Sequence, residues 1–138
     1  MAGRIPKGMM RLNKRGIFSV CALLFFITGF AQTDSSYQKK ENAKEKLKSI
    51  REDIIAGKID FRNAAIKYSM DPATASQGGL YKDIPLGTFV PEFEVIAFNI
   101  GIQKVSEIFE TDYGCHILLV EARRGNIIDV RHILIIPK

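Results

Sequence analysis

Two apolar stretches in the last third of the chain, separated by a polar segment, constrain the fold more than any other feature of the sequence. Residues 113–120 and 130–136 are rich in large apolar side chains, and Pro137 ends the second stretch. Residues 123–126, between them, are polar and include a glycine. Apolar runs bounded by turn residues are typical of β-strands. The sequence therefore predicts two strands joined by a turn.

Two stretches with helical spacing precede these strands. The first begins at Glu41 and ends at Gly57, and its apolar residues recur four, three and four positions apart, at Ala43, Leu47, Ile50 and Ile54. The second begins after Asp60, whose side chain can cap it, and ends before Pro72, because the residue before a proline disfavours helical angles. Its predicted buried side consists of Phe61, Ala64, Ala65 and Tyr68.

A third, short helix is predicted over residues 91–98. Pro91 suits the first helical position, and Glu92 and Glu94 fall in the positively polarised first turn. The turn-rich residues 73–90 are predicted to form a surface loop, and residues 32–40 a flexible polar leader. This order of elements indicates an α+β domain in which helices cover one side of a small antiparallel sheet.

The first 31 residues have the pattern of a secretory signal. Basic residues up to Arg15 precede an apolar segment over residues 16–30, and Ala31 stands before a possible cleavage site. A retained membrane anchor is the alternative, because this segment is only slightly shorter than the roughly 20 residues that span a bilayer. The sequence thus predicts an exported domain, either released by cleavage or anchored to the membrane.

Charge and cysteine content narrow the classes of partner. The formal net charge of +5 arises from basic residues before position 32, where no acidic residue occurs, so the rest of the chain is balanced. A basic face that binds nucleic acid is therefore not indicated. Cleavage after Ala31 would remove Cys21 and leave Cys115 as the one thiol, which excludes an internal disulfide.

The two histidines, His116 and His132, both fall inside the predicted strands, on faces that they share with apolar residues. Each could be a hydrogen-bonded core residue or a member of a functional site. A zinc site is disfavoured, because Cys115 and His116 are neighbours in a strand and point to opposite faces. We expect no metal and no other cofactor.

Several segments together resemble the parvulin-type peptidyl-prolyl isomerases, especially the SurA-like periplasmic chaperones. These segments are residues 68–71, 77–79, 87–94, 109–117 and 130–134. The resemblance implies a parvulin domain over residues 41–122, a turn over 123–129 and, over 130–138, a strand similar to the first strand of such domains. It also implies a four-stranded antiparallel sheet with helices packed around it and a shallow apolar site for a proline-containing segment.

The resemblance also implies roles for individual residues. Phe89 and Phe93 match the floor and wall for the prolyl ring, and Tyr113 matches the rim of the site. His116 and His132 match a central pair of histidines. Asp71 occupies a place that cysteine or aspartate holds in relatives, and we expect it to share a hydrogen-bond network with the histidines.

The chain departs from the family in two respects. No apolar run before Glu41 could serve as the family's first strand. Either residues 130–137 open a second domain, which leaves the first domain incomplete, or they fold back beside residues 113–120 and fill the vacant place, because an absent central strand would leave backbone groups unpaired. In addition, Leu80-Tyr81-Lys82 replaces a more usual acidic-leucine-glycine turn.

The expected function, which the resemblance implies, is peptidyl-prolyl cis-trans isomerisation that assists the folding of exported proteins in the periplasm. The domain would be released there by cleavage of the signal or, alternatively, stay anchored to the inner membrane and face the periplasm. The partners would be unfolded or partly folded exported proteins with X-Pro segments, and the membrane would be contacted only through an uncleaved N-terminal segment. Isomerisation needs no bond cleavage, because a site can bind the twisted amide better than either planar form. The alternative is a noncatalytic chaperone module that binds peptides in the same groove.

Overall fold

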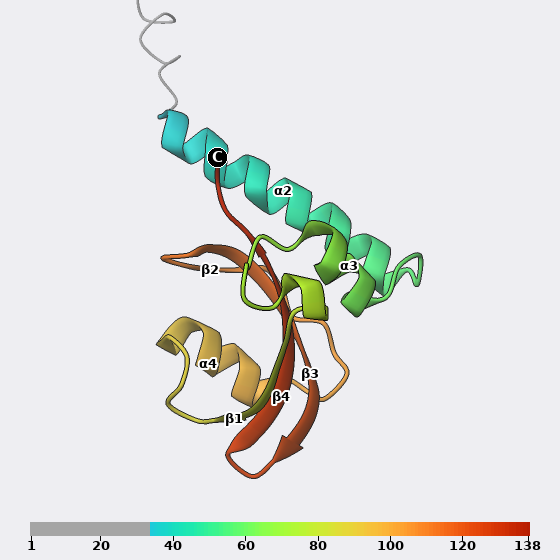
Figure 1. Cartoon of the computed structure of the whole chain (residues 1–138). Helices are drawn as coiled ribbons and strands as arrows, with labels where there is room; N and C mark the ends of the chain where they lie inside the picture. Colours follow the sequence, from blue (N-terminus) through green and yellow to red (C-terminus); the bar gives the residue numbers. More distant parts are fainter. Residues whose placement is uncertain (1–33) are drawn as a thin grey trace, which may run out of the picture. The chain divides into compact units, whose positions relative to one another are not determined.

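The computed structural model describes residues 34–138 (Figure 1). The predicted signal or anchor over residues 1–31 lies outside the described residues. Between residues 34 and 138, no helix has both the length and the apolar character needed to cross a membrane.

A four-stranded antiparallel sheet forms the centre of the described domain. The strands are β1 (Leu80–Pro85), β2 (Phe109–Thr111), β3 (Gly114–Arg124) and β4 (Ile127–Ile135), in the order β1-β4-β3-β2. The two predicted strands are confirmed as β3 and β4, and both extend into the polar segment between them. Gly125, with φ of 61°, supplies the left-handed conformation that so tight a turn requires.

The last strand, β4, docks between β1 and β3. Its residues pair with β3 over most of its length, for example Ile133 opposite Ile117 and Val130 opposite Val120. Its other edge pairs with β1, where Val130 lies opposite Tyr81. Of the two alternatives for residues 130–137, the one in which this strand folds back beside residues 113–120 is therefore confirmed, and β4 has partners on both edges.

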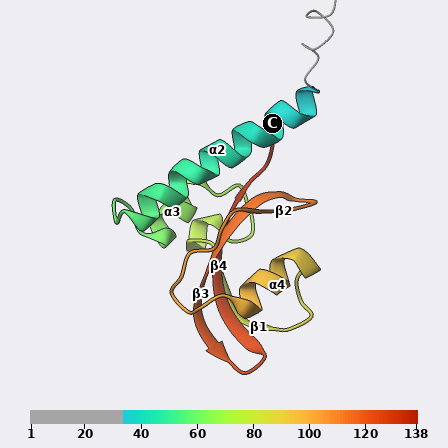
Figure 2. The same ribbon diagram turned by 180° about the vertical axis from the view of Figure 1, so that it is seen from behind.

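Helices cover both faces of the sheet, so the expectation that they cover one side is wrong. Helices α2 (Ser35–Ile55) and α3 (Phe61–Tyr68) pack on the face that carries Ile117 and Ile133. Helix α4 (Pro91–Asn99) packs on the opposite face, against Leu118 and Val130. Figures 1 and 2 show the sheet between α4 and the other two helices. The physical reason is that the central strands are apolar on both faces, and both faces must be buried.

The helix boundaries agree with the predicted ones except at the start of α2. Asp60 caps α3 by accepting a hydrogen bond from the Asn63 amide at 2.8 Å, and Pro91 opens α4, as expected. Helix α2, however, begins at Ser35, whereas a flexible leader was expected up to residue 40. The side chains of residues 35–40 are exposed, so no apolar periodicity could indicate this first turn and a half.

The prediction of a surface loop over residues 73–90 is also wrong in part. This segment contains the short 3₁₀ helix η1 (Ala75–Gln77) and the strand β1. Strand β1 lies at the edge of the sheet, and its register shifts between Tyr81 and Ile84. Proline and an irregular register are tolerated at a sheet edge, where one side of the backbone needs no partner. Because of these features, the sequence pattern did not predict this strand.

Candidate functional site

A cavity of about 360 Å³ opens on the face of the sheet that α4 covers. All six residues that the sequence analysis named line this cavity: Asp71, Phe89, Phe93, Tyr113, His116 and His132. The remaining lining residues are Tyr81, Thr88, Val90, Thr111 and Leu134. The site therefore draws side chains from the loop after α3, from α4 and the loop before it, and from all four strands or their turns.

A buried carboxylate and a buried imidazole form the first part of the polar side of the cavity. Asp71 Oδ2 lies 2.8 Å from His132 Nε2, and both residues are less than 10% exposed. The loop holds Asp71 locally, because the Ala73 amide donates to Oδ1 at 3.0 Å and the Thr74 hydroxyl donates to Oδ2. The carboxylate can therefore take only a narrow range of orientations toward β4.

The charge state of Asp71 follows from these contacts. Burial opposes its ionisation, but hydrogen bonds from Thr74, His132 and the Ala73 amide outweigh that effect and lower the pKa to about 2. The carboxylate is therefore ionised at neutral pH and accepts a hydrogen bond from the imidazole of His132.

The two imidazoles lie one above the other on neighbouring strands. The ring centres of His116 and His132 are 5.7 Å apart, and the ring planes differ by 17°. His116 Nε2 lies 2.7 Å from Thr111 Oγ1, and that hydroxyl oxygen also accepts a hydrogen bond from the Tyr113 amide at 3.1 Å. The Thr111 proton is thus free to be donated to His116. Each ring therefore has its own hydrogen bond, His116 to Thr111 and His132 to Asp71, and the two rings contact each other by stacking.

Both histidines are held in the neutral form. Burial and, to a smaller extent, the neighbouring His132 together lower the pKa of His116 to about 4, against an opposing effect of the Asp71 charge. Burial also lowers the pKa of His132, although the hydrogen bond to Asp71 works in the opposite direction. Neutral imidazole carries one donor and one acceptor nitrogen. The Nδ1 atoms of both rings are buried without a hydrogen-bond partner, so each ring keeps one unused polar atom.

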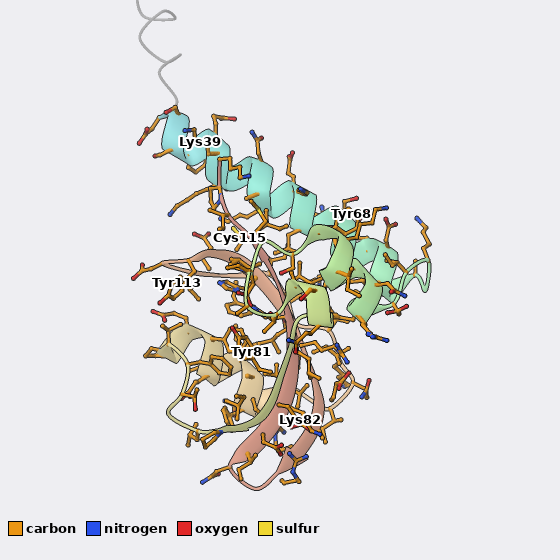
Figure 3. All side chains as sticks on the ribbon, in the orientation of Figure 1. Lys39, Tyr68, Tyr81, Lys82, Tyr113 and Cys115 are labelled. Atoms are coloured by element: carbon orange, nitrogen blue, oxygen red, sulfur yellow. The ribbon has the colours of Figure 1, made fainter. Side chains whose placement is uncertain are left out.

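Aromatic rings form the apolar side of the cavity. Phe93 from α4 is 4% exposed, and its ring centre lies 5.6 Å from that of His132 and 6.1 Å from that of His116, edge to face in both cases. The ring of Phe89 lies 4.5 Å from that of Phe93. Tyr113, at the turn between β2 and β3, is 65% exposed and stands at the edge of the cavity (Figure 3).

Local structure explains where Phe89 sits. The side chain of Glu94, in the first turn of α4, accepts hydrogen bonds from the Gly87 amide at 2.7 Å and the Phe89 amide at 3.1 Å. A carboxylate near a helix start that binds preceding amides fixes the path by which the chain enters the helix. The segment before α4 therefore presents Phe89 toward Phe93.

Three polar residues of the site were not named from the sequence. Thr74 and Tyr81 bond to Asp71, and Thr111 bonds to His116. A single threonine or tyrosine in a turn or an edge strand carries no periodic signal, so only the fold brings these residues to the site. The sequence did offer one clue, because Tyr81 lies in the turn that departs from the family pattern.

Cys115 lies outside this site. It is 1% exposed and packs with α2 and α3 on the opposite face of the sheet, where burial raises the pKa of its thiol. Figure 3 shows it on the side of the sheet toward α2. Within residues 34–138, no group of three or more His, Cys, Asp or Glu side chains is placed to hold a metal ion. The cavity thus offers an aromatic surface beside two separately hydrogen-bonded imidazoles, and the one cysteine of the described part of the chain does not line it.

A small α+β sheet domain with a pair of stacked histidines beside an aromatic cavity is the arrangement that defines the parvulin class. The comparison with protein families agrees, because residues 27–122 match the rotamase family, described as the PPIC-type PPIASE domain. This match covers more than half of the chain. The protein therefore belongs to the parvulin-type family of PPIC peptidyl-prolyl isomerase domains.

Curated relatives support this assignment. The chain is similar to the chaperone SurA of Alcanivorax borkumensis, with 33% identity over 81 residues, which cover 59% of this chain and 19% of the relative. It is similar to the foldase protein PrsA of Halalkalibacterium halodurans, with 40% identity over 89 residues, which cover 64% and 25%. It is also similar to the peptidyl-prolyl cis-trans isomerase Pin1 of Arabidopsis thaliana, with 38% identity over 79 residues, which cover 57% and 66%.

The matched region therefore spans about a fifth to a quarter of the length of the SurA and PrsA relatives. The match to the family ends at residue 122, so β4 and His132 lie beyond the matched residues.

Proposed function

We propose that this protein is a peptidyl-prolyl cis-trans isomerase that assists the folding of exported proteins by binding their X-Pro segments. The observation that carries the proposal is the cavity itself. In it, the imidazole rings of His116 and His132 lie edge to face with the ring of Phe93, and His132 is hydrogen-bonded to Asp71. The family assignment and the relatives named as chaperone, foldase and isomerase support the same function.

The aromatic side of the cavity supports binding of the prolyl ring. Phe93 and Phe89 offer two adjacent ring faces, and Tyr113 offers a third, exposed ring at the edge. A planar amide owes its barrier of roughly 18 to 20 kcal/mol to resonance, which also makes it strongly polar. Transfer to an apolar surface disfavours the polar planar form relative to the twisted form, in which resonance is lost. Binding at this surface would therefore lower the rotational barrier.

The polar side of the cavity supports discrimination between planar and twisted amides. Twisting changes the charge on the carbonyl oxygen and makes the nitrogen a better hydrogen-bond acceptor. Two neutral imidazoles, one held by Thr111 and the other by the ionised Asp71, keep their donors and acceptors in fixed directions, and such preorganised groups stabilise a transition state most effectively. In this mechanism Asp71, His116 and His132 act through hydrogen bonding, and none of them forms a covalent bond with the substrate.

We propose that the domain acts in the periplasm. This proposal rests on the sequence pattern of residues 1–31, which predicts a cleaved signal or a retained anchor. Fractionation of cells that produce the full chain tests it, since a cleaved signal predicts a soluble periplasmic product that begins after Ala31.

The isomerase proposal is tested by the refolding of a substrate protein whose slow phase is limited by proline isomerisation. The wild-type chain should accelerate that phase in proportion to its concentration. The variant Tyr113→Ala should reduce kcat/KM several-fold, and Phe93→Ala should reduce it further. Tyr37→Ala is the matched control for Tyr113→Ala, because Tyr37 is 57% exposed on α2 and does not line the cavity.

Circular dichroism and urea unfolding would establish that each variant is folded before it is compared. A folded wild-type chain that gives no acceleration would overturn the isomerase proposal. If that chain still bound a proline-containing peptide, and Tyr113→Ala weakened the binding, the noncatalytic peptide-binding module would be the correct function.

A further inference from the structure

Tyr81 contacts both the polar and the aromatic side of the cavity. Its hydroxyl donates to Asp71 Oδ2 at 3.2 Å. Its ring centre lies 5.4 Å from that of His132 and, edge to face, 5.2 Å from that of Phe89. Figure 3 shows the labelled Tyr81 beside β1, on the side toward α4.

The sheet fixes the direction of this side chain. Tyr81 on β1 lies opposite Val130 on β4, and directly opposed residues of paired strands point to the same face. Val130 is fully buried on the face that α4 covers. The register of β1 shifts only after Tyr81, so the regular part of the strand is the part that aims the ring at the site.

The hydroxyl adds a third structural element to the support of Asp71. The Ala73 amide and the Thr74 hydroxyl bind the carboxylate from its own loop, and His132 binds it from β4. Tyr81 binds it from the edge strand β1. A carboxylate held from three directions cannot turn away from the imidazole without breaking a hydrogen bond.

The role that we assign to Tyr81 rests on the proposed isomerase function. We propose that Tyr81 is a positioning and specificity residue of the site, whose hydroxyl keeps Asp71 aligned with His132 and whose ring, with Phe89, forms one wall of the prolyl cavity. Tyr81 belongs to the segment Leu80-Tyr81-Lys82, which replaces a more usual acidic-leucine-glycine turn. Leucine at this position would supply an apolar wall without the hydroxyl, so this chain combines two roles in one side chain.

The first test is Tyr81→Phe, which removes only the hydroxyl. In the full chain it should lower kcat about three- to tenfold, the effect expected from loss of one hydrogen bond of ordinary strength while three others still hold the carboxylate, and leave KM unchanged. The carboxyl carbon of Asp71, followed by NMR over a pH titration, should titrate at a higher pH, because a donor to the charged form is lost. Among residues 34–138, the titratable groups that face Asp71 are His132, Tyr81 and, through His132, His116.

The second test is Tyr81→Leu, which removes the ring as well. It should lower kcat as Tyr81→Phe does and also raise KM for a proline-containing peptide several-fold. Tyr37→Phe is the matched control, because it removes a tyrosine hydroxyl outside the cavity, and it should leave kcat, KM and the Asp71 titration unchanged. An unchanged KM in Tyr81→Leu would overturn the specificity role.

The positioning role fails if Tyr81→Phe leaves kcat unchanged. It fails also if kcat falls while the Asp71 titration stays the same, because the hydroxyl would then act by a route other than Asp71. These outcomes are distinct from a failure of the proposed function, in which the wild-type chain itself gives no acceleration. Even then, a shift of the Asp71 titration in Tyr81→Phe would show that the Tyr81 hydroxyl binds the Asp71 carboxylate. The titration needs a folded variant but no isomerase activity.

Discussion

At the scale of single residues, the site depends on one close approach between backbones. The Gly79 carbonyl accepts a hydrogen bond from the His132 amide at 2.9 Å, and the loop before β1 thereby touches β4 beside an imidazole of the site. A Cβ atom on Gly79 would lie 2.1 Å from the His132 carbonyl oxygen, which is far inside van der Waals contact. Gly79 also has a φ of +72°, which L residues with a side chain rarely adopt.

Gly79→Ala should therefore destabilise the protein strongly. The left-handed conformation alone costs about 1 to 2 kcal/mol with alanine, and displacement of the β4 backbone should add at least about 2 kcal/mol. Urea unfolding measures the change. Gly57→Ala is the matched control, because Gly57 has nearly the same φ of +71° and nothing within 4 Å of an added Cβ, so it should show only the smaller cost. Equal losses in the two variants would contradict the close approach.

The sequence identified residues that line the cavity where their chemical type is unusual in its surroundings or where they match the family's motifs. His116 and His132 stand out because a titratable ring in an apolar strand is uncommon, whereas Asp71 is identified only by its match to a position of the family's motifs. Nothing in the local sequence distinguishes Thr111, and Tyr81 is distinguished only by the turn that departs from the family pattern. Their importance arises from contacts between segments far apart in the chain, which periodicity does not report.

At the scale of elements, β4 determines whether the sheet is complete. It separates β1 from β3 and contributes apolar side chains to both faces, Ile133 toward α2 and α3 and Val130 toward α4. The backbone groups of the two central strands have partners on both sides, which satisfies the requirement that buried amides and carbonyls be hydrogen-bonded. The sequence predicted both long strands because their apolar runs are continuous, and it missed β1 and β2 because they are short, lie at the edges and are only partly buried.

Ile133→Ala tests the docking of β4. Ile133 is fully buried on the face of β4 that packs against α2 and α3, so its truncation should lower the free energy of unfolding by about 2 to 5 kcal/mol. Ile127→Ala, in the same strand, should cost less than about 1 kcal/mol, because Ile127 is 39% exposed. Similar small losses for both variants in urea unfolding would show that β4 is not docked as described.

At the scale of the whole molecule, the site and the stability of the domain are coupled through pH. His116 and His132 are buried in the neutral form, with pKa values below those of free histidine. The unfolded chain therefore binds more protons than the folded chain once the pH falls below the ordinary histidine value. The stabilisation that the neutral rings represent is present at neutral pH and is lost as the pH falls through the folded pKa.

The free energy of unfolding should consequently decrease as the pH falls from about 6.5 to about 4. For His116 alone, whose pKa is lowered from 6.5 to about 4, the decrease should be roughly 2 to 3 kcal/mol. Urea unfolding at pH 7.5, 6, 5 and 4 measures it. The variant His116→Gln has no ring to titrate, so its pH dependence over this range should be shallower. A wild-type stability that does not change between pH 7.5 and 4 would contradict the buried neutral pair.

The position of β4 in the chain order has a consequence for biosynthesis. The strand that inserts between two others is translated after both of them, and it carries one of the two stacked imidazoles. A nascent polypeptide that has left the ribosome only as far as β3 displays the edges of β1 and β3 unpaired and lacks the ring that binds Asp71. Unpaired edges and uncovered apolar surface are aggregation-prone. A domain of the parvulin class with this topology is therefore prone to aggregation until the strand β4 has been synthesised and can dock.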